Sequence, residues 1–187
     1  MRQDPGLLQK ALAAGASPDT LISASNAEPR SALATAVAAK LPDHVRLLLA
    51  AGARLEHDPA LLCSAIIASG GDALRILTLL LQAGADPNAD HGSAFFACLT
   101  HADEAGALLL ISRLMEYGGD VNCTDRHGRT PLEYALAGEL HHLSSTLVCA
   151  GARLPEQLDS LPCSDELKAL VRRNARDLEV RRLLLGT

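Results

Sequence analysis

Along most of the chain, short leucine-rich stretches end at a recurring glycine. The glycine lies in a small-residue phrase such as Ala-Ala-Gly-Ala, which occurs with variations at residues 13–16, 50–53, 82–85, 117–120 and 149–152. Glycine at the end of a helix accepts the left-handed conformation that satisfies the last carbonyls. Each phrase therefore predicts a helix C-terminus. The glycines, at positions 15, 52, 84, 118 and 151, are 37, 32, 34 and 33 residues apart, a spacing typical of repeat proteins.

A second phrase opens a helix between these glycines. At residues 130–135 it reads TPLEYA, with Thr130 as the N-cap and Pro131 in the first turn. Residues 31–36 and 93–98 fit the same frame without the proline, and residues 60–65 fit it more loosely. Each unit thus consists of a turn, a helix, a short loop, a second helix and a glycine stop. The pattern predicts helix pairs near residues 31–50, 60–82, 94–116 and 130–149.

These phrases resemble the ankyrin-repeat family. The best match is GGDVN at residues 118–122, DRHGRTPL at 125–132 and LVCAGA at 147–152, and a second strong match is GADPN at 84–88. Glu133 replaces the histidine that is usual in the family. The resemblance covers roughly residues 5–154. It implies an all-α solenoid of stacked helix-turn-helix units with short hairpin turns and helical caps.

The resemblance divides the chain into one ankyrin-repeat domain over residues 1–187. Its expected parts are an N-terminal half-repeat cap with a long turn (1–29), four repeats (30–53, 54–85, 86–119 and 120–152) and a C-terminal helical cap (153–187). The spacing from Ala65 to Gly84 and from Cys98 to Gly118 exceeds the 16 residues between Ala135 and Gly151. We therefore expect extra loop residues between the helices of the second and third repeats, including a polar loop over 101–106.

The C-terminal cap is predicted from residues 164–185, which have a helical pattern. Apolar side chains line one side and arginines the other, and a repeat stack needs a polar outer face at each end. We expect this stretch to break near Asn174 into two short helices. The apolar side would consist of Leu167, Leu170, Val171, Leu178, Val180 and Leu183.

Composition and charge narrow the function classes. The chain contains two Phe, two Tyr and no Trp, so its core must be mainly aliphatic, and Leu and Ala favour helices. Residues 1–163 carry 11 basic and 18 acidic side chains, a net charge of −7. An acidic body disfavours general nucleic-acid binding, which depends on neutralising phosphates. No apolar run approaches the roughly 18 residues of a membrane span, and no signal peptide is evident, so we expect a cytoplasmic protein.

Candidate chemistry is sparse. The five cysteines contain no C-x-x-C pair, so we expect free thiols, no metal and no cofactor. No phosphate loop or nucleophile motif occurs, so we expect no catalytic residue and no enzymatic activity. Asp86 and Asp120, each followed two residues later by asparagine, are expected to brace the turns through local hydrogen bonds.

The resemblance implies that a partner contacts the turn tips and the exposed side of each first helix. Three successive tips each contain a histidine, which fits either ordinary polar turns or a row of binding residues. Arg126 and Arg129 flank the third histidine, and the ankyrin frame does not require arginine there. The predicted partner-binding residues are His57, Asp58, Asp90, His91, Phe96, Arg126, His127, Arg129 and Tyr134.

The sequence therefore favours a monomeric, non-catalytic module that binds a specific protein partner. Among the 17 basic residues only three are lysine, a bias typical of GC-rich bacterial genomes. Two narrower roles stay open: an immunity protein that neutralises a toxin, and a secreted effector that acts on host proteins. An enzyme is the competing class, but no constellation of residues supports it.

Overall fold

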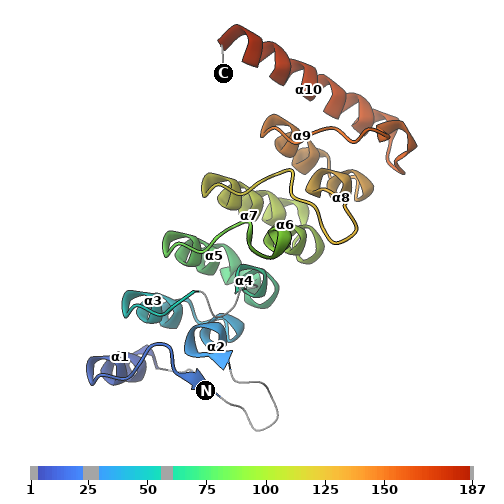
Figure 1. Cartoon of the computed structure of the whole chain (residues 1–187). Helices are drawn as coiled ribbons and strands as arrows, with labels where there is room; N and C mark the ends of the chain where they lie inside the picture. The colour runs from blue at the N-terminus through green and yellow to red at the C-terminus, as the bar shows by residue number, and fades with distance from the viewer. Residues whose placement is uncertain (1–3, 23–29, 56–60, 186–187) are drawn as a thin grey trace. The chain divides into compact units, whose positions relative to one another are not determined.

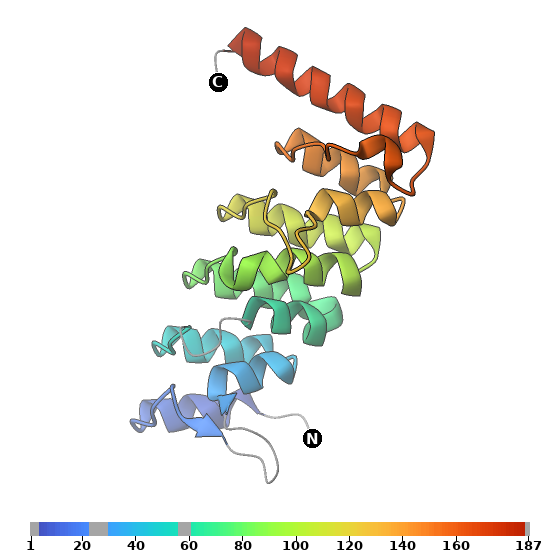
Figure 2. The ribbon, with the colours of Figure 1, turned by 45° about the vertical axis from the view of Figure 1, so that its right-hand side comes forward.

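The structure is a computed structural model that describes residues 4–22, 30–55 and 61–185. It divides into two compact units, Met1–Asp90 and His91–Thr187. Among the described residues, regular secondary structure is helical except for one pair of two-residue strands, which confirms the predicted all-α class. Figure 1 labels the elements, and Figure 2 shows the same ribbon after a turn of 45°.

In the N-terminal unit, inner helices pack on one another and outer helices flank them. Helix α2 packs on α3 and α4, α4 packs on α5, and α3 packs on both α1 and α5 (Figure 1). Strand β1 pairs antiparallel with β2, with Leu21 opposite Ser31. The elements are α1 (Pro5–Ala13), β1 (Leu21–Ile22), β2 (Arg30–Ser31), α2 (Ala32–Ala38), α3 (Pro42–Ala50), α4 (Leu61–Ser69), the 3₁₀ turn η1 (Gly70–Asp72) and α5 (Ala73–Gln82).

In the C-terminal unit, helix α9 is central and packs on α7, α8 and α10. The first turn of α6 crosses the boundary between the units. The elements are α6 (Ala89–His101), α7 (Glu104–Glu116), α8 (Pro131–Ala137), α9 (His141–Cys149), the 3₁₀ turn η2 (Leu158–Ser160) and α10 (Asp165–Leu185).

The buried core is aliphatic and lies between successive helices, as the composition predicts. Aliphatic side chains with essentially no exposed surface line the facing sides of neighbouring helices in each unit. Phe95 is the one fully buried aromatic residue of the described part of the chain. The largest buried aliphatic side chains are Leu33, Leu48, Ile76, Leu77 and Leu80 in the first unit, and Ile111, Leu114, Leu132, Leu136, Leu143 and Leu147 in the second.

The recurring glycines end the outer helices in the predicted way. At Gly118, for example, φ is +87°, and the following N–H of Gly119 donates to the carbonyl of Leu114 over 2.9 Å. The glycines at 15, 52, 84 and 151 also have positive φ, between 85° and 98°. This is the hydrogen-bonded stop that glycine permits because it has no Cβ.

Two local predictions are wrong. Helix α10 does not break near Asn174, because the Asn174 amide donates to Ser145 Oγ on α9 (2.6 Å) instead of competing with the helix backbone. Its apolar side packs only in the first half: Val171 is buried, whereas Leu183 is 84% exposed. The predicted loop at 101–106 is mostly helical, because α6 extends to His101 and Asp103 caps α7 by accepting from the N–H of Gly106 (2.9 Å).

The interfaces between helices should determine stability. Leu132 and Leu147 are fully buried, so replacing either with Ala should lower the free energy of unfolding by about 2–5 kcal/mol. Leu109 on α7 is 60% exposed and gives a matched control, Leu109→Ala, which should change it by less than about 0.5 kcal/mol. Urea titrations of the three variants measure this. Equal midpoints for all three would show that the helix register is wrong.

The left-handed glycines should matter through their backbone conformation and not through packing. A Cβ added at Gly118 or at Gly71 would meet nothing within 4 Å, but only Gly118 has positive φ. Gly118→Ala should therefore cost about 1–2 kcal/mol of backbone strain. Gly71→Ala should cost much less, and similar losses in denaturant titrations of the two variants would refute this explanation.

Candidate partner-binding site

The hairpin that precedes α8 is organised around one carboxylate, that of Asp125. The backbone of Asp125 and Arg129 closes the turn, because Asp125 N–H donates to the Arg129 carbonyl (3.0 Å). Asp125 Oδ1 accepts from the N–H groups of His127 (2.8 Å) and Arg129 (2.9 Å). Gly128 supplies the positive φ, +76°, that the turn requires. The hairpin tip therefore has a defined backbone, which fixes the direction of its exposed side chains.

The second oxygen of Asp125 connects the turn to helix α8. Asp125 Oδ2 accepts from Arg129 Nη2 (3.1 Å), from Arg129 Nε (3.3 Å) and from the Tyr134 hydroxyl (2.8 Å). Arg129 Nη2 also donates to the Tyr134 hydroxyl, and Arg129 Cζ lies 4.2 Å from the centroid of the Tyr134 ring. This is cation–π geometry. Arg129 is therefore held by a carboxylate and by an aromatic face.

These contacts change the pKa values of Asp125 and Tyr134. Partial desolvation raises the pKa of Asp125, but the hydrogen bonds from Arg129, Tyr134 and His127 outweigh it and hold the pKa well below its usual range. The hydrogen bond to Asp125 raises the pKa of Tyr134. At neutral pH, Asp125 is thus an anion and Tyr134 is a neutral donor.

An aromatic pair lies beside this network. The rings of Phe96 on α6 and Tyr134 on α8 have centroids 5.4 Å apart and are tilted by 58°. Both residues are partly exposed. Tilted pairs at this distance are favourable, and partly exposed aromatic side chains are common at protein interfaces.

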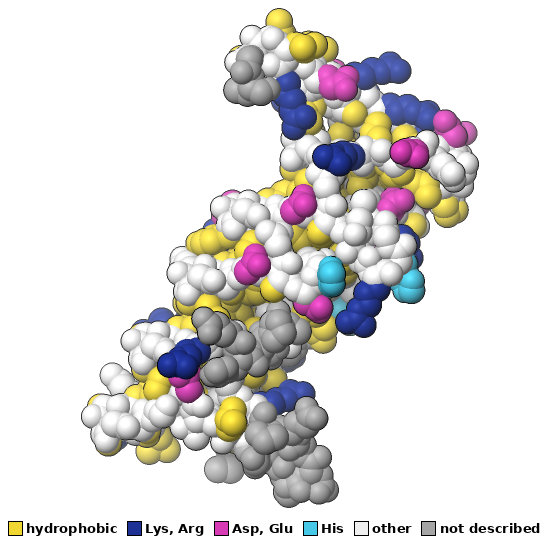
Figure 3. All heavy atoms as spheres, in the orientation of Figure 1, with side chains coloured by type: hydrophobic (Ala, Val, Ile, Leu, Met, Phe, Trp, Pro, Cys, Tyr) yellow, Lys and Arg dark blue, Asp and Glu magenta, His cyan; other side chains and the backbone are white. Residues whose placement is uncertain are grey.

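The basic side chains of the hairpin are at the surface. Arg126 and His127 are exposed, and among the described residues the Arg126 side chain has no hydrogen bond or ion pair. The Arg129 side chain is 52% exposed, although it pairs with Asp125. Figure 3 shows Lys or Arg and His side chains close together near the hairpin between α7 and α8. We call Phe96, Arg126, His127, Arg129 and Tyr134 the basic–aromatic face.

Of the other predicted partner-binding residues, one lies near the hairpin, one belongs to the N-terminal unit, and two fall outside the described residues. His91 is exposed, has φ +57° and precedes Gly92, where an added Cβ would lie 2.6 Å from Cys123 Sγ. His91 therefore lies next to the base of the same hairpin. Asp90 is exposed, with φ +49°, at the end of the N-terminal unit. His57 and Asp58 lie outside the described residues.

The base of the hairpin has the bracing role predicted for the Asp and Asn positions. Asp120 Oδ1 accepts from the N–H of Asn122 (2.8 Å). The Asn122 side chain then donates to the carbonyl of Gly151 (3.3 Å) and accepts from the N–H of Arg153 (2.9 Å). These contacts join successive turns, and they give both the amide nitrogen and the amide oxygen of Asn122 a hydrogen-bond partner within the chain.

Asp103 and Glu104 also have structural roles. The Glu104 carboxylate accepts from the N–H groups of His142 (2.8 Å) and Leu143 (3.1 Å) at the start of α9. A carboxylate at a helix N-terminus satisfies amides that have no partner within the helix. Neither Glu104 nor the N-cap Asp103 is therefore poised for acid–base chemistry.

Among the residues that the structure describes, the other reactive groups form no metal site. In the described ranges, no group of three or more His, Cys, Asp or Glu side chains could hold a metal ion. Cys123, Cys149 and Cys163 have free thiols, and burial raises the pKa of Cys123 to about 11, so the Cys123 thiol is not activated. None of the helices in the described ranges combines the length and apolar character that a membrane crossing requires.

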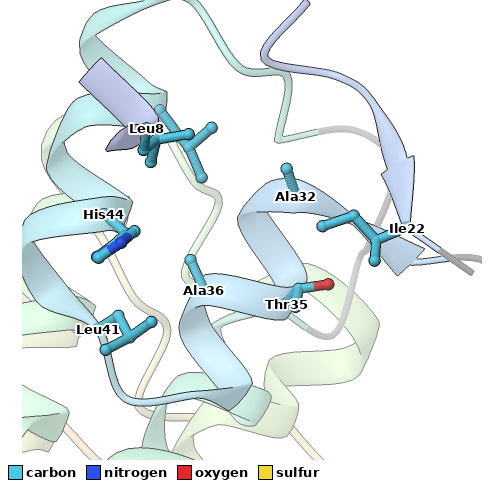
Figure 4. A pocket seen from close by; sticks show the side chains of 8 residues that line it. Leu8, Ile22, Ala32, Thr35, Ala36, Leu41 and His44 are labelled. Carbon is cyan, nitrogen blue, oxygen red and sulfur yellow. The ribbon is translucent and has the colours of Figure 1, made fainter. Parts of the chain in front are cut away.

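The N-terminal unit contains an apolar hollow of about 170 Å³ between α1, α2 and α3 (Figure 4). It lies on the side of α2 that faces α1, an outer helix without an inner helix of its own among the described residues. Its lining has one imidazole and no carboxylate, thiol or amine. The hollow is thus a gap between the apolar side chains of these three helices, and its lining offers no constellation of reactive groups. The lining residues are Leu8, Ile22, Ala32, Thr35, Ala36, Leu41, His44 and Leu48.

Sequence comparisons give only partial similarity. No family model matches the chain. The ARF GTPase-activating protein GIT2 of Mus musculus is 33% identical over 84 residues, which are 45% of this chain and 12% of that protein. The ARF GTPase-activating protein Git of Drosophila melanogaster is 39% identical over 74 residues, 40% of this chain and 10% of that protein. The chain thus matches only about a tenth of the length of these curated relatives.

A structural comparison identifies the fold. The ankyrin repeat domain of Bcl-3, a member of the IκB protein family, superimposes with a TM-score of 0.68. The match covers 90% of this chain and 77% of that domain, at 23% sequence identity. The predicted ankyrin-repeat fold is therefore confirmed.

The Asp125 network predicts a specific pH dependence. A depressed pKa in the folded state stabilises the fold above the unfolded-state pKa of about 4, and this contribution disappears as the pH falls through the folded-state value. The parent chain should thus be more stable than Asp125→Asn at pH 7, and the difference should shrink below about pH 4. Urea midpoints at pH 7, 5 and 3 measure this. A constant difference at all three would contradict the assignment.

Proposed function

We propose that this chain is a non-catalytic protein-binding module whose partner contacts the hairpin before α8 and the adjoining sides of α6 and α8. The observation that supports this most is the basic–aromatic face. Asp125 fixes the backbone of the hairpin that carries this face. The Arg126 side chain nevertheless makes no hydrogen bond or ion pair within the described part of the fold. A rigid loop with exposed Arg and Tyr fits a binding surface, because these residue types dominate binding hot spots.

Rigidity is a second argument for a binding role. A flexible loop loses conformational entropy when it binds, whereas a fixed loop has lost it on folding. The Asp125 carboxylate already holds the backbone of His127 and Arg129 and the side chain of Tyr134. Binding would therefore require little further ordering of this hairpin.

An enzymatic use of Asp125, Arg129 and Tyr134 is less consistent with the geometry. A general base near neutral pH needs a pKa close to the working pH and an oxygen free to reach a substrate proton. The Asp125 carboxylate accepts five hydrogen bonds from the protein, and its pKa is lowered. The names of GIT2 and Git describe GTPase activation. We do not assign that activity to this chain, because the matches cover only about a tenth of those proteins.

Site-directed photocrosslinking in cells tests the proposal. A photoreactive amino acid replaces the exposed Thr124, next to Asp125, and in a matched control it replaces the exposed Leu109 on outer helix α7. The Thr124 position should give a discrete protein adduct that the Leu109 position does not give. Adding Arg126→Glu should reduce the adduct without changing the melting temperature. Adducts at Leu109 only, or none at either position, would contradict the proposal.

The identity of the adduct separates the two narrower roles. A toxin encoded beside the gene would support an immunity protein, and a host protein would support a secreted effector. Mass spectrometry of the purified adduct distinguishes them.

A further inference from the structure

We propose that the basic–aromatic face binds an acidic partner segment, in which an Asp or Glu side chain lies one or two residues from an apolar side chain. This inference rests on the proposed function and specifies the chemistry of the partner. It depends on three features of this region: the hydrogen bonds that its carboxylates accept, the arginine donors that have no acceptor among the described residues, and the position of its apolar surface.

The two acids of residues 124–134, one in the hairpin and one in the first turn of α8, accept hydrogen bonds from the chain itself. The Asp125 side chain is only 13% exposed and accepts from the backbone and from two side chains. The Glu133 carboxylate accepts from the N–H of Thr130 (2.7 Å) and from its hydroxyl (3.1 Å) in a capping box. Although residues 124–134 contain two acids and two arginines, the charge that they present to solvent is positive.

The cationic side chains retain donors for a ligand. Arg129 uses Nε and Nη2 on Asp125 and Tyr134, and among the described residues its Nη1 donates to no acceptor. Arg126 is exposed, and its guanidinium donates to no acceptor in the part of the chain that the structure describes. Arginine presents a planar set of donors that matches a carboxylate, so a partner Asp or Glu can bind here with two hydrogen bonds. The Arg129 guanidinium is already fixed on the Tyr134 ring, so its ordering adds little cost.

The apolar surface is immediately beside these donors. Arg129 Cζ lies 4.2 Å from the Tyr134 ring centroid, and the Tyr134 and Phe96 ring centroids are 5.4 Å apart. Consecutive Cα atoms are about 3.8 Å apart, and residues i and i+2 of an extended segment project to the same side at about 6–7 Å. An acidic residue on Arg129 thus positions an apolar neighbour against the two rings.

Selection from a display library of random 12-residue peptides tests this inference on the full chain. The selected peptides should be enriched in Asp or Glu, with Leu, Ile, Phe or Tyr one or two positions away. The best synthetic peptide should bind Arg126→Glu at least about 10-fold more weakly than the parent. Arg46→Glu is the matched control, because Arg46 is exposed on α3 in the other unit, and it should leave the affinity unchanged.

The possible outcomes separate the two proposals. Peptides without acidic enrichment, or an affinity that Arg126→Glu leaves intact, overturn the acidic motif, while a Thr124 adduct would still support protein binding. Failure to select any binder also overturns the acidic motif. A 20-nucleotide single strand that binds the parent but not Arg126→Glu, with no acidic peptide selected, would assign the face to phosphate instead. The acidic motif is supported only by enrichment together with sensitivity to Arg126→Glu.

Discussion

The structure depends on one constraint: a two-helix unit of this kind cannot bury its own apolar stripe. Its helices are short, with nine residues in α9 and seven in α8, and isolated helices of this length are marginal in water. Stability therefore comes from burying leucines against the next helices, as Leu132 and Leu147 do completely. The glycine stops and the capping box at Thr130 set where each helix ends, so that successive apolar stripes face one another.

Because the helices supply the core, the hairpins that connect repeats are free to differ. In the hairpin before α8, the Asp125 carboxylate is largely buried and accepts hydrogen bonds from the loop, whereas Arg126 and Arg129 are exposed. Its base is braced by Asn122, which joins it to the turn that contains Gly151 and Arg153, and its tip is braced by Asp125. The same contacts that stabilise the loop thus fix the donors that we assign to a partner.

Much of the fold could be predicted from the sequence because glycines and capping residues set the helix ends through contacts within a single turn. Gly118 needs no distant partner to end a helix, and Thr130 and Pro131 begin one through contacts within a single turn. The prediction failed where a contact between residues far apart in the sequence determines whether a helix continues. Asn174 looks like a helix breaker, but its amide donates to Ser145, 29 residues earlier. The extra residues between Cys98 and Gly118 are mostly helical, in α6 and α7, and do not form the expected loop.

The candidate site was predictable only in part. Arg126, Arg129 and Tyr134 stood out by type and position, but Asp125, which organises them, looked like an ordinary turn residue; its place three residues before a glycine was the only signal. Hydrogen exchange of the chain with and without its crosslinked partner tests whether the partner contacts the hairpin before α8. We expect slower exchange at amides of residues 124–134 and 93–98 in the complex. Slower exchange confined to α9, α10 or the N-terminal unit, with residues 124–134 unchanged, would contradict it.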